Sequence, residues 1–438
     1  MPILVVLAGV AALLFLIIYL RFNAFIALII VALGVGIGMQ MAPTAVIDSI
    51  QKGVGSTLGY LALILGLGAM LGALIAESGA AKLITERLID VFGKKNIQWA
   101  VILAGFIVGV PMFYTVGFVM LVPIIFAVAA STRLPLLYVG IPMVAALSVT
   151  HGFLPPHPAP TAIAVIYQAD IGLTLLYGLI LAVPTIIIAG PIFARTLKNY
   201  DVKPRTDLFP PMETDVDKLP SFSVSVLTAL IPVFLMGFAA IAKLQLAEES
   251  AAYQFFNFIG NPVIALLIAV LIATYTLGTR TGKTLKQVMD SLTTSVKAIA
   301  MIMLIIAGGG ALKQVLIDSG ISDYIVELFS NTNISPLILA WSIAAALRIA
   351  LGSATVAALT AAGIALPLVG STDVSPELLV LATGAGSLTL SQVNDTGFWL
   401  FKEYFGLSIK ETFMSWTVME TIVSVVGLIG CLILDFFV

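Results

Sequence analysis

The chain has 438 residues, of which 60% are hydrophobic and only 10% are charged, and its net charge is −2. Soluble domains carry about 25% charged residues, so the composition excludes an ordinary soluble protein. The net charge gives no argument for a nucleic-acid partner, and none is expected. Apolar runs of about 18 or more residues recur from end to end and predict an all-α, polytopic membrane protein. Cys431 is the single cysteine, so no internal disulfide can form.

The elements of the first half are predicted from its apolar runs. Spans are expected at 3–20, 23–41, 56–77 and 172–196, with an amphipathic connector near 43–55 and two longer runs at 97–131 and 136–169. The run 97–131 is too long for one crossing and is interrupted at Val110-Pro111. It is expected to form either two full spans or a re-entrant hairpin.

A polar stretch at 198–221 divides the chain and is expected to be a cytoplasmic linker. The second half repeats the order of the first, with spans expected at 222–243, 262–279, 296–318 and 412–436, an amphipathic stretch at 283–295, and longer runs at 334–370 and 376–405. The segment 65–79 also resembles 306–320, since both are glycine-rich and end in an acidic residue followed by Ser-Gly. We therefore expect two repeats, 1–197 and 222–438.

Each repeat is predicted to cross the membrane an odd number of times, which inverts the second repeat relative to the first. The expected total is about ten spans plus two hairpins, or up to about 14 spans if 97–131 and 334–370 each cross twice. The second of these runs is interrupted at Gly352-Ser353. Inverted repeats with broken helices are typical of secondary transporters.

Basic residues bear on this topology. When the loops are assigned alternately to the two sides, only Lys52 and Lys243 fall on one side, and nearly all other lysines and arginines outside the spans fall on the opposite side. Positive charge accumulates in cytoplasmic loops. Both termini are therefore expected in the periplasm or outside the cell.

The first candidate break inside the membrane is THGFLPPHPAPT, at 150–161. Its four prolines remove amide donors and interrupt the helical hydrogen bonds, and it holds both histidines of the chain, His151 and His157. Polar groups at this depth are usually functional, and imidazoles exchange protons near neutral pH. The alternative is a loop whose backbone the histidines satisfy. The histidines lack the spacing and carboxylate partners of a zinc site, so no metal is expected.

The second candidate break, SLTLSQVNDTGFW at 387–399, occupies the corresponding place in the second half. Asn394 and Asp395 offer amide donors, an amide acceptor and a carboxylate, a set that suits a polyol. Asp395, in an otherwise apolar setting, is also the first candidate for a proton carrier. An ordinary Asx-turn is the alternative interpretation.

The third candidate break lies at 347–363. A tight turn there places Ser353, Thr355 and free backbone amides at a half-helix N-terminus, which suits a carboxylate or a hydroxyl. Arg348 is a guanidinium inside the membrane and needs an anionic partner, either a substrate carboxylate or Asp395. A structural ion pair and direct substrate binding both remain open.

The fourth candidate break, at 109–118, presents the hydroxyls of Tyr114 and Thr115, although helix packing explains its glycines equally well. Glu77 and Asp318 fall near the ends of spans. They are expected to be solvated rather than coupled to transport.

Three long and specific stretches carry a family resemblance: LPLLYVGIPMVAALSVTHGFLPPHPAPTAIA (134–164), NISPLILAWSIAAALRIALGSATVAALTAAGIA (333–365) and VNDTGFWLFKEYF (393–405). On these stretches the chain resembles, nearly end to end, the gluconate:proton symporter (gluconate permease) family. The resemblance implies a bacterial inner-membrane carrier that imports gluconate or a related sugar acid with protons. The superfamily of ion transporters in which this family is grouped further implies inverted repeats, two re-entrant hairpins and a homodimer that works by an elevator motion.

The chain departs from the family pattern at several positions. It has Thr115 where the pattern has glutamate, Ala159 where the pattern has glycine, and Gln392 where the pattern has histidine. The missing glutamate removes one obvious proton carrier. It leaves open another small hydroxy acid, such as glycerate or D-serine, as the substrate.

The residues expected to bind substrate fall into two groups. The carboxylate is expected near Ser353, Thr355 and Arg348, and the hydroxyls near Thr150, His157, Thr161, Asn394 and Asp395. Asp395, with His157 as the second candidate, is expected to carry the coupling proton. No cofactor is expected. An intramembrane enzyme would require nucleophile–base or metal-ligand spacing, a channel would require a continuous polar stripe, and direct use of ATP would require a P-loop; the sequence has none of these.

Overall fold

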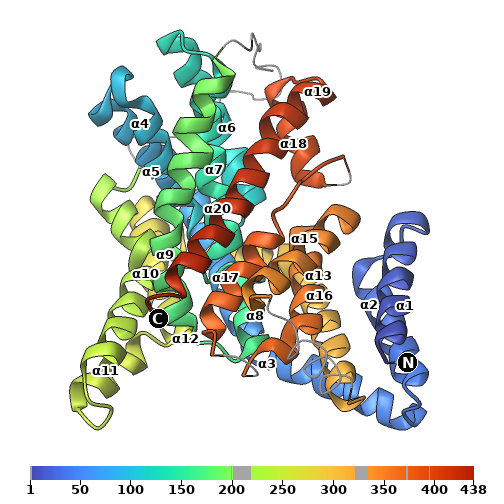
Figure 1. Cartoon of the computed structure of the whole chain (residues 1–438). Helices are drawn as coiled ribbons and strands as arrows, with labels where there is room; N and C mark the ends of the chain where they lie inside the picture. The colour runs from blue at the N-terminus through green and yellow to red at the C-terminus, as the bar shows by residue number, and fades with distance from the viewer. Residues whose placement is uncertain (1, 199, 201–218, 321–333, 371–372, 394) are drawn as a thin grey trace.

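The computed structural model describes residues 2–198, 200, 219–320, 334–370, 373–393 and 395–438, and every regular element in these ranges is a helix (Figure 1). Most of the predicted linker at 198–221 lies outside the described residues, as does Asn394. The first-half helices are α1 (Pro2–Leu14), α2 (Ala24–Gly38), α3 (Pro43–Glu77), α4 (Ala80–Phe92), α5 (Ile97–Gly109), α6 (Tyr114–Thr132), α7 (Leu136–Phe153), α8 (Pro158–Tyr167) and α9 (Ile171–Ile187).

The second-half helices are α10 (Phe222–Gln245), α11 (Ala251–Ile259), α12 (Pro262–Ala273), α13 (Leu285–Asp318), α15 (Pro336–Leu351), α16 (Ala354–Ala365), α17 (Pro376–Gly386), α18 (Thr396–Phe405), α19 (Ile409–Thr412) and α20 (Val418–Leu434). Single π-turns extend α1, α9 and α12 and join α19 to α20. The amphipathic stretch expected at 283–295 is not a separate connector. It continues into the following span as one 34-residue helix, α13.

Within the described ranges, six helices are long and apolar enough to cross a membrane, or up to eight if each sharply bent pair counts as one span. The chain is therefore an all-helical, multi-pass membrane protein. The expected total of about ten spans and the two inverted repeats stay predictions.

One span lies inside the protein rather than against lipid. In the span formed by α7 and α8, 89% of the most apolar window is buried, against 39–44% in the other five spans. Helices α5, α6, α9 and α20 pack around α7. The proline-rich break between α7 and α8 therefore sits at the centre of the fold.

The long helices α3 and α13 cross closely because glycines remove side chains at the contact. A Cβ on Gly310 would lie 2.2 Å from Thr57 Oγ1 and 2.7 Å from the Gly53 carbonyl oxygen. A Cβ on Gly53 would lie 2.3 Å from the Gly310 carbonyl oxygen. The glycines thus serve close packing of the two backbones.

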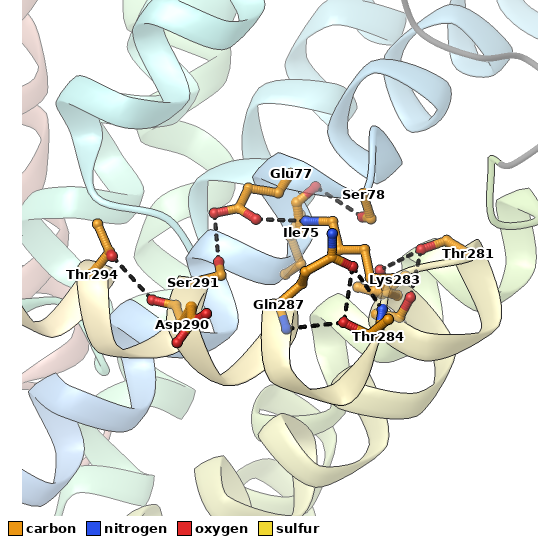
Figure 2. A network of polar contacts seen from close by, with 12 residues as sticks. Ile75, Glu77, Ser78, Thr281, Lys283, Thr284, Gln287, Asp290, Ser291 and Thr294 are labelled. Carbon is orange, nitrogen blue, oxygen red and sulfur yellow. Dashed lines mark hydrogen bonds and ion pairs between the residues drawn. The ribbon is translucent and has the colours of Figure 1, made fainter.

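The two ends of this crossing are joined by similar polar contacts. At the end of α3, Glu77 accepts hydrogen bonds from Lys283 Nζ, at 2.6 Å, and from the Ser291 hydroxyl (Figure 2). At the end of α13, Asp318 accepts one from the Ser49 hydroxyl at 2.7 Å. The end of each helix therefore bonds to the first half of the other, so the helices are antiparallel, as repeats of opposite topology require.

Both runs that are too long for one crossing break where the sequence predicts. α5 ends at Gly109 and α6 begins at Tyr114. α15 ends at Leu351, where Gly352 has a φ of 74° that a side chain would strain. α15 and α16 pack against each other and are 16 and 12 residues long. Because α16 spans only about 18 Å, it is too short to cross the hydrocarbon core.

Candidate functional site

The four candidate breaks meet at one cavity of about 240 Å³. His151 and Pro158 line it from the first break, Asp395 from the second, Ser353 from the third and Tyr114 from the fourth. Segments that are far apart in the chain thus line one cavity, whose wall includes both buried and exposed residues. The packing of α7 at the centre of the fold is what brings them together.

Four helices begin at the wall of this cavity. Their first residues, Tyr114 of α6, Pro158 of α8, Ala354 of α16 and Thr396 of α18, all line it. A helix N-terminus carries roughly half a positive charge and, except where proline stands, free amide donors. Their convergence makes the cavity favourable for an anion.

The only guanidinium in the cavity wall, as far as the chain is described, belongs to Arg348, which is 3% exposed. Its Nη2 bonds to Asp395 Oδ2, so Asp395 is the anionic partner that the sequence left open. Asp395 also accepts hydrogen bonds from the Ser391 hydroxyl and, at 3.0 Å, from the Gly397 amide. Ser391 is held in turn by Trp416 Nε1 at 2.7 Å. The carboxylate is therefore fixed by a positive charge and two donors.

Ser353 and Thr355 line the cavity beside this ion pair. Ser353 caps α16, where its hydroxyl accepts from the Val356 amide at 3.4 Å. Two nitrogens of Arg348, Nε and Nη1, have no hydrogen-bond partner among the described residues. The arrangement leaves donors free for a carboxylate at the start of α16.

The proline-rich break presents His151, and not His157, to the cavity. His157 lies behind it with ring centroids 5.3 Å apart, and its Nε2 is 2.8 Å from the Gly109 carbonyl oxygen. Because a carbonyl oxygen only accepts, Nε2 carries the proton. Thr150 and Thr161 are fully buried and do not line the cavity.

Sequence reasoning missed Glu420, which lies in α20 and is 2% exposed. It lines the cavity, as does Ser148 of α7. Glu420 is the one acidic residue in the apolar run 412–434, and this is the signal that would have found it, since such residues are rarely placed in a span without a role.

Several buried polar atoms in the wall have no hydrogen-bond partner in the described part of the chain: Tyr114 Oη, His151 Nδ1, Arg348 Nε and Nη1, and Glu420 Oε1. Buried polar groups are normally paired. Phenol, imidazole, guanidinium and carboxyl groups together suit a ligand that carries both hydroxyls and a negative charge. No group of three or more histidine, cysteine or acidic side chains within the described ranges could hold a metal ion.

The sequence profile of the GntP family permeases matches residues 1–437. This chain belongs to the GntP permease family. It is a permease rather than an enzyme, as the sequence predicts.

The relatives of this permease align over nearly their whole length. The high-affinity gluconate transporter of Escherichia coli (strain K12) is 57% identical over 435 residues, with 99% of each chain covered. The Gnt-II system L-idonate transporter of the same strain is 54% identical, again with 99% of each chain covered. The gluconate permease of Bacillus subtilis (strain 168) is 51% identical and covers 100% of each chain.

Two solved transporter structures share the fold of this permease. The Alcanivorax borkumensis YdaH transporter superimposes with a TM-score of 0.62 at 15% identity, covering 88% of this chain and 87% of that chain. Neisseria gonorrhoeae MtrF superimposes with a TM-score of 0.59 at 17% identity, covering 89% and 83%. At such low identity the likeness extends to the fold alone.

Proposed function

We propose that this permease imports gluconate or a closely related sugar acid, together with protons, across the bacterial inner membrane by alternating access. The observation that carries the proposal is the convergence of four helix N-termini and the Arg348 guanidinium on one cavity. An anion in such a cavity is stabilised by oriented amide dipoles and by a charge-assisted hydrogen bond. The relatives named as gluconate and L-idonate transporters support the substrate class.

The substrate is proposed to lie with its carboxylate at the start of α16. Ser353, Thr355 and the free nitrogens of Arg348 would bind the carboxylate there. The hydroxyls would reach Tyr114 and His151, which also line the cavity and have polar atoms without partners in the described structure. Asp395 would act chiefly by positioning Arg348, since its own oxygens already accept three hydrogen bonds.

The sequence predicts that Thr150, His157, Thr161 and Asn394 contact the substrate hydroxyls. This proposal assigns them no such direct contact. The first three would support the break around His151 from behind, and Asn394 lies outside the described residues. Movement of one repeat-derived bundle past the other, in a homodimer, would expose the cavity alternately. That motion and the dimer follow from the superfamily resemblance.

The proposal is tested with purified permease in proteoliposomes and radiolabelled gluconate. Accumulation against a gluconate gradient, driven by an inward proton gradient, is expected. L-idonate should compete strongly, glycerate and D-serine weakly, and the neutral gluconolactone poorly, because it lacks the carboxylate. Uptake that only equilibrates, or that the lactone blocks as well as the acid does, would overturn the proposal. Stronger competition by glycerate or D-serine would instead identify a smaller hydroxy acid as the substrate.

A further inference from the structure

Glu420 stands apart from every other acidic side chain in the described membrane-spanning helices. It lies one turn into α20, within the span Ile409–Leu434, and only 2% of it is exposed. Its Oε1 has no hydrogen-bond partner among the described residues, although the carboxyl group lies in the cavity wall. Packing alone does not explain an acid at this place.

The charged and titratable groups that face Glu420 come from four elements. They are Arg348 of α15, Asp395 before α18, His151 of α7 and Tyr114 of α6. Of the other described elements that pack against α20, α9, α17 and the π-turn Ile188–Ile192 contribute no residue to the cavity wall, and the π-turn Phe413–Thr417 contributes Trp416, which is not ionisable. Arg348 is the one fixed positive charge in this set.

That positive charge is already committed to another acid. Arg348 Nη2 bonds to Asp395, which is further held by the Ser391 hydroxyl and the Gly397 amide. Glu420 shares the cavity wall with Ser148 and has no ion pair in the described structure. A buried carboxylate without a cation is unfavourable and takes up a proton instead. The two acids of the cavity therefore differ: Asp395 has an ion-pair partner, and Glu420 has none among the described residues.

We propose that Glu420 is a proton-binding site of this permease and that the proton it holds crosses the membrane with the substrate anion. This inference rests on the proposed function and names the group that couples it to protons. It replaces Asp395 and His157, the sequence-based candidates, in that role. Asp395 is engaged with Arg348, and His157 does not line the cavity.

Coupling then follows from the charge of the cavity. With Glu420 ionised, an arriving carboxylate would share a small cavity with an unpaired like charge. Protonation of Glu420 removes that repulsion, and the neutral carboxylic acid gains a donor for a substrate oxygen. When the cavity opens to the cytoplasm and the anion leaves, water solvates the carboxylate and the proton dissociates. One anion and one proton move together, so the loaded and empty cavities carry the same net charge.

The test compares wild type with Glu420→Gln in proteoliposomes, using radiolabelled gluconate. For one proton per anion, wild type is expected to accumulate gluconate about tenfold for each pH unit of inward gradient. Glu420→Gln keeps the shape and the neutral state but cannot release a proton. It is expected to exchange gluconate across the membrane while its accumulation falls to the equilibrium level at every gradient.

Glu77→Gln is the matched control, since it makes the same change at an acid outside the cavity that has its own partners. It should accumulate gluconate as wild type does. Proton-driven accumulation by Glu420→Gln at the wild-type level would overturn the inference and leave the proposed function intact. Failure of wild type to take up gluconate at all would overturn the proposed function, and the inference with it.

A second variant covers the case in which Glu420→Gln neither exchanges nor folds. Ser148→Ala keeps both acids of the cavity and removes a hydroxyl that lines the same wall as Glu420. It is expected to shift the external pH at which uptake is half-maximal. An unchanged pH profile in a Ser148→Ala protein that still transports gluconate would overturn the inference.

Discussion

Two regions of this permease hold acidic side chains in opposite circumstances. At the ends of the α3–α13 crossing, Glu77 and Asp318 each accept two hydrogen bonds from neighbouring side chains. In the central cavity, Glu420 and Arg348 have buried polar atoms without a partner in the described structure. The acidic groups of the first region have hydrogen-bond partners, so that region is a saturated cluster. The second region contains buried polar atoms that lack partners, so it is an unsaturated cluster.

This difference separates structural polarity from functional polarity. A saturated cluster contributes to holding two helices together, and little is gained by adding a ligand. An unsaturated buried group raises the free energy of the empty protein, and a ligand that supplies the missing partners recovers it. The comparison therefore predicts different outcomes for substitutions in the two regions.

The largest effect is expected from Arg348→Ala. It leaves Asp395 as an uncompensated buried charge, which costs about 3–5 kcal/mol, and it removes the cation at the substrate carboxylate. The melting temperature should fall, and gluconate uptake should be lost. Arg348→Lys retains the charge but not the two-pronged geometry, so it should recover stability more than uptake. Uptake by Arg348→Ala at the wild-type level would show that Arg348 does not bind the substrate.

A somewhat smaller effect is expected at the α3–α13 crossing. In Gly310→Ala the new methyl group would lie 2.2 Å from Thr57 Oγ1, and overpacking of this kind costs about 1–3 kcal/mol. The melting temperature in detergent measures it. Gly66→Ala, in the same helix pair but with no atom within 4 Å of the new Cβ, is the control and should melt as wild type does. Equal melting of both variants would contradict the close crossing.

Substitution of His157, which does not line the cavity, tests whether its role is structural or functional. His157→Leu leaves the buried Gly109 carbonyl without its donor, at a cost of about 1–3 kcal/mol, whereas the amide of His157→Gln can replace the hydrogen bond. The His157→Gln variant should therefore have a melting temperature well above that of His157→Leu, and it should keep the wild-type pH profile of uptake. An altered pH profile of uptake in His157→Gln would show that the His157 imidazole takes part in proton coupling.

The smallest effect is expected at the exposed end of the crossing. The Glu77 side chain in the Lys283–Glu77 pair is 43% exposed, and such pairs contribute at most about 1 kcal/mol. Lys283→Ala should lower the melting temperature slightly, less so at high salt, and leave gluconate uptake as in wild type. A loss of proton-driven accumulation would show that this contact takes part in transport.

Much of the fold was predictable because local chemistry determines it. Prolines and glycines limit the backbone wherever they stand, so the breaks at Val110-Pro111, at 150–161 and at Gly352-Ser353 could be read from the sequence. Hydrophobic length likewise identified the apolar runs that form the six helices long enough to cross a membrane in the described ranges, whereas the total number of spans stays a prediction. The meeting of these breaks at one cavity was expected from the similarity of the two halves.

The orientation of side chains was less predictable, because it depends on how helices pack. The sequence offers both His151 and His157, and only the rotation of α7 against its neighbours brings His151 to the cavity. Glu77 and Asp318 are exposed to solvent, as expected, but the sequence did not reveal that each also bonds to a side chain of the opposite helix. Their partners lie more than 200 residues away along the chain, beyond any local pattern.

The central claim is that the sugar acid occupies the cavity at the start of α16. The most direct measurement uses Thr355→Cys in a Cys431→Ala background, with the rate of thiol alkylation followed in proteoliposomes. Gluconate is expected to slow alkylation at Thr355→Cys and to leave it unchanged at Lys95→Cys, an exposed position far from the cavity wall. If gluconate does not slow the alkylation of a Thr355→Cys protein that still transports gluconate, the account is contradicted.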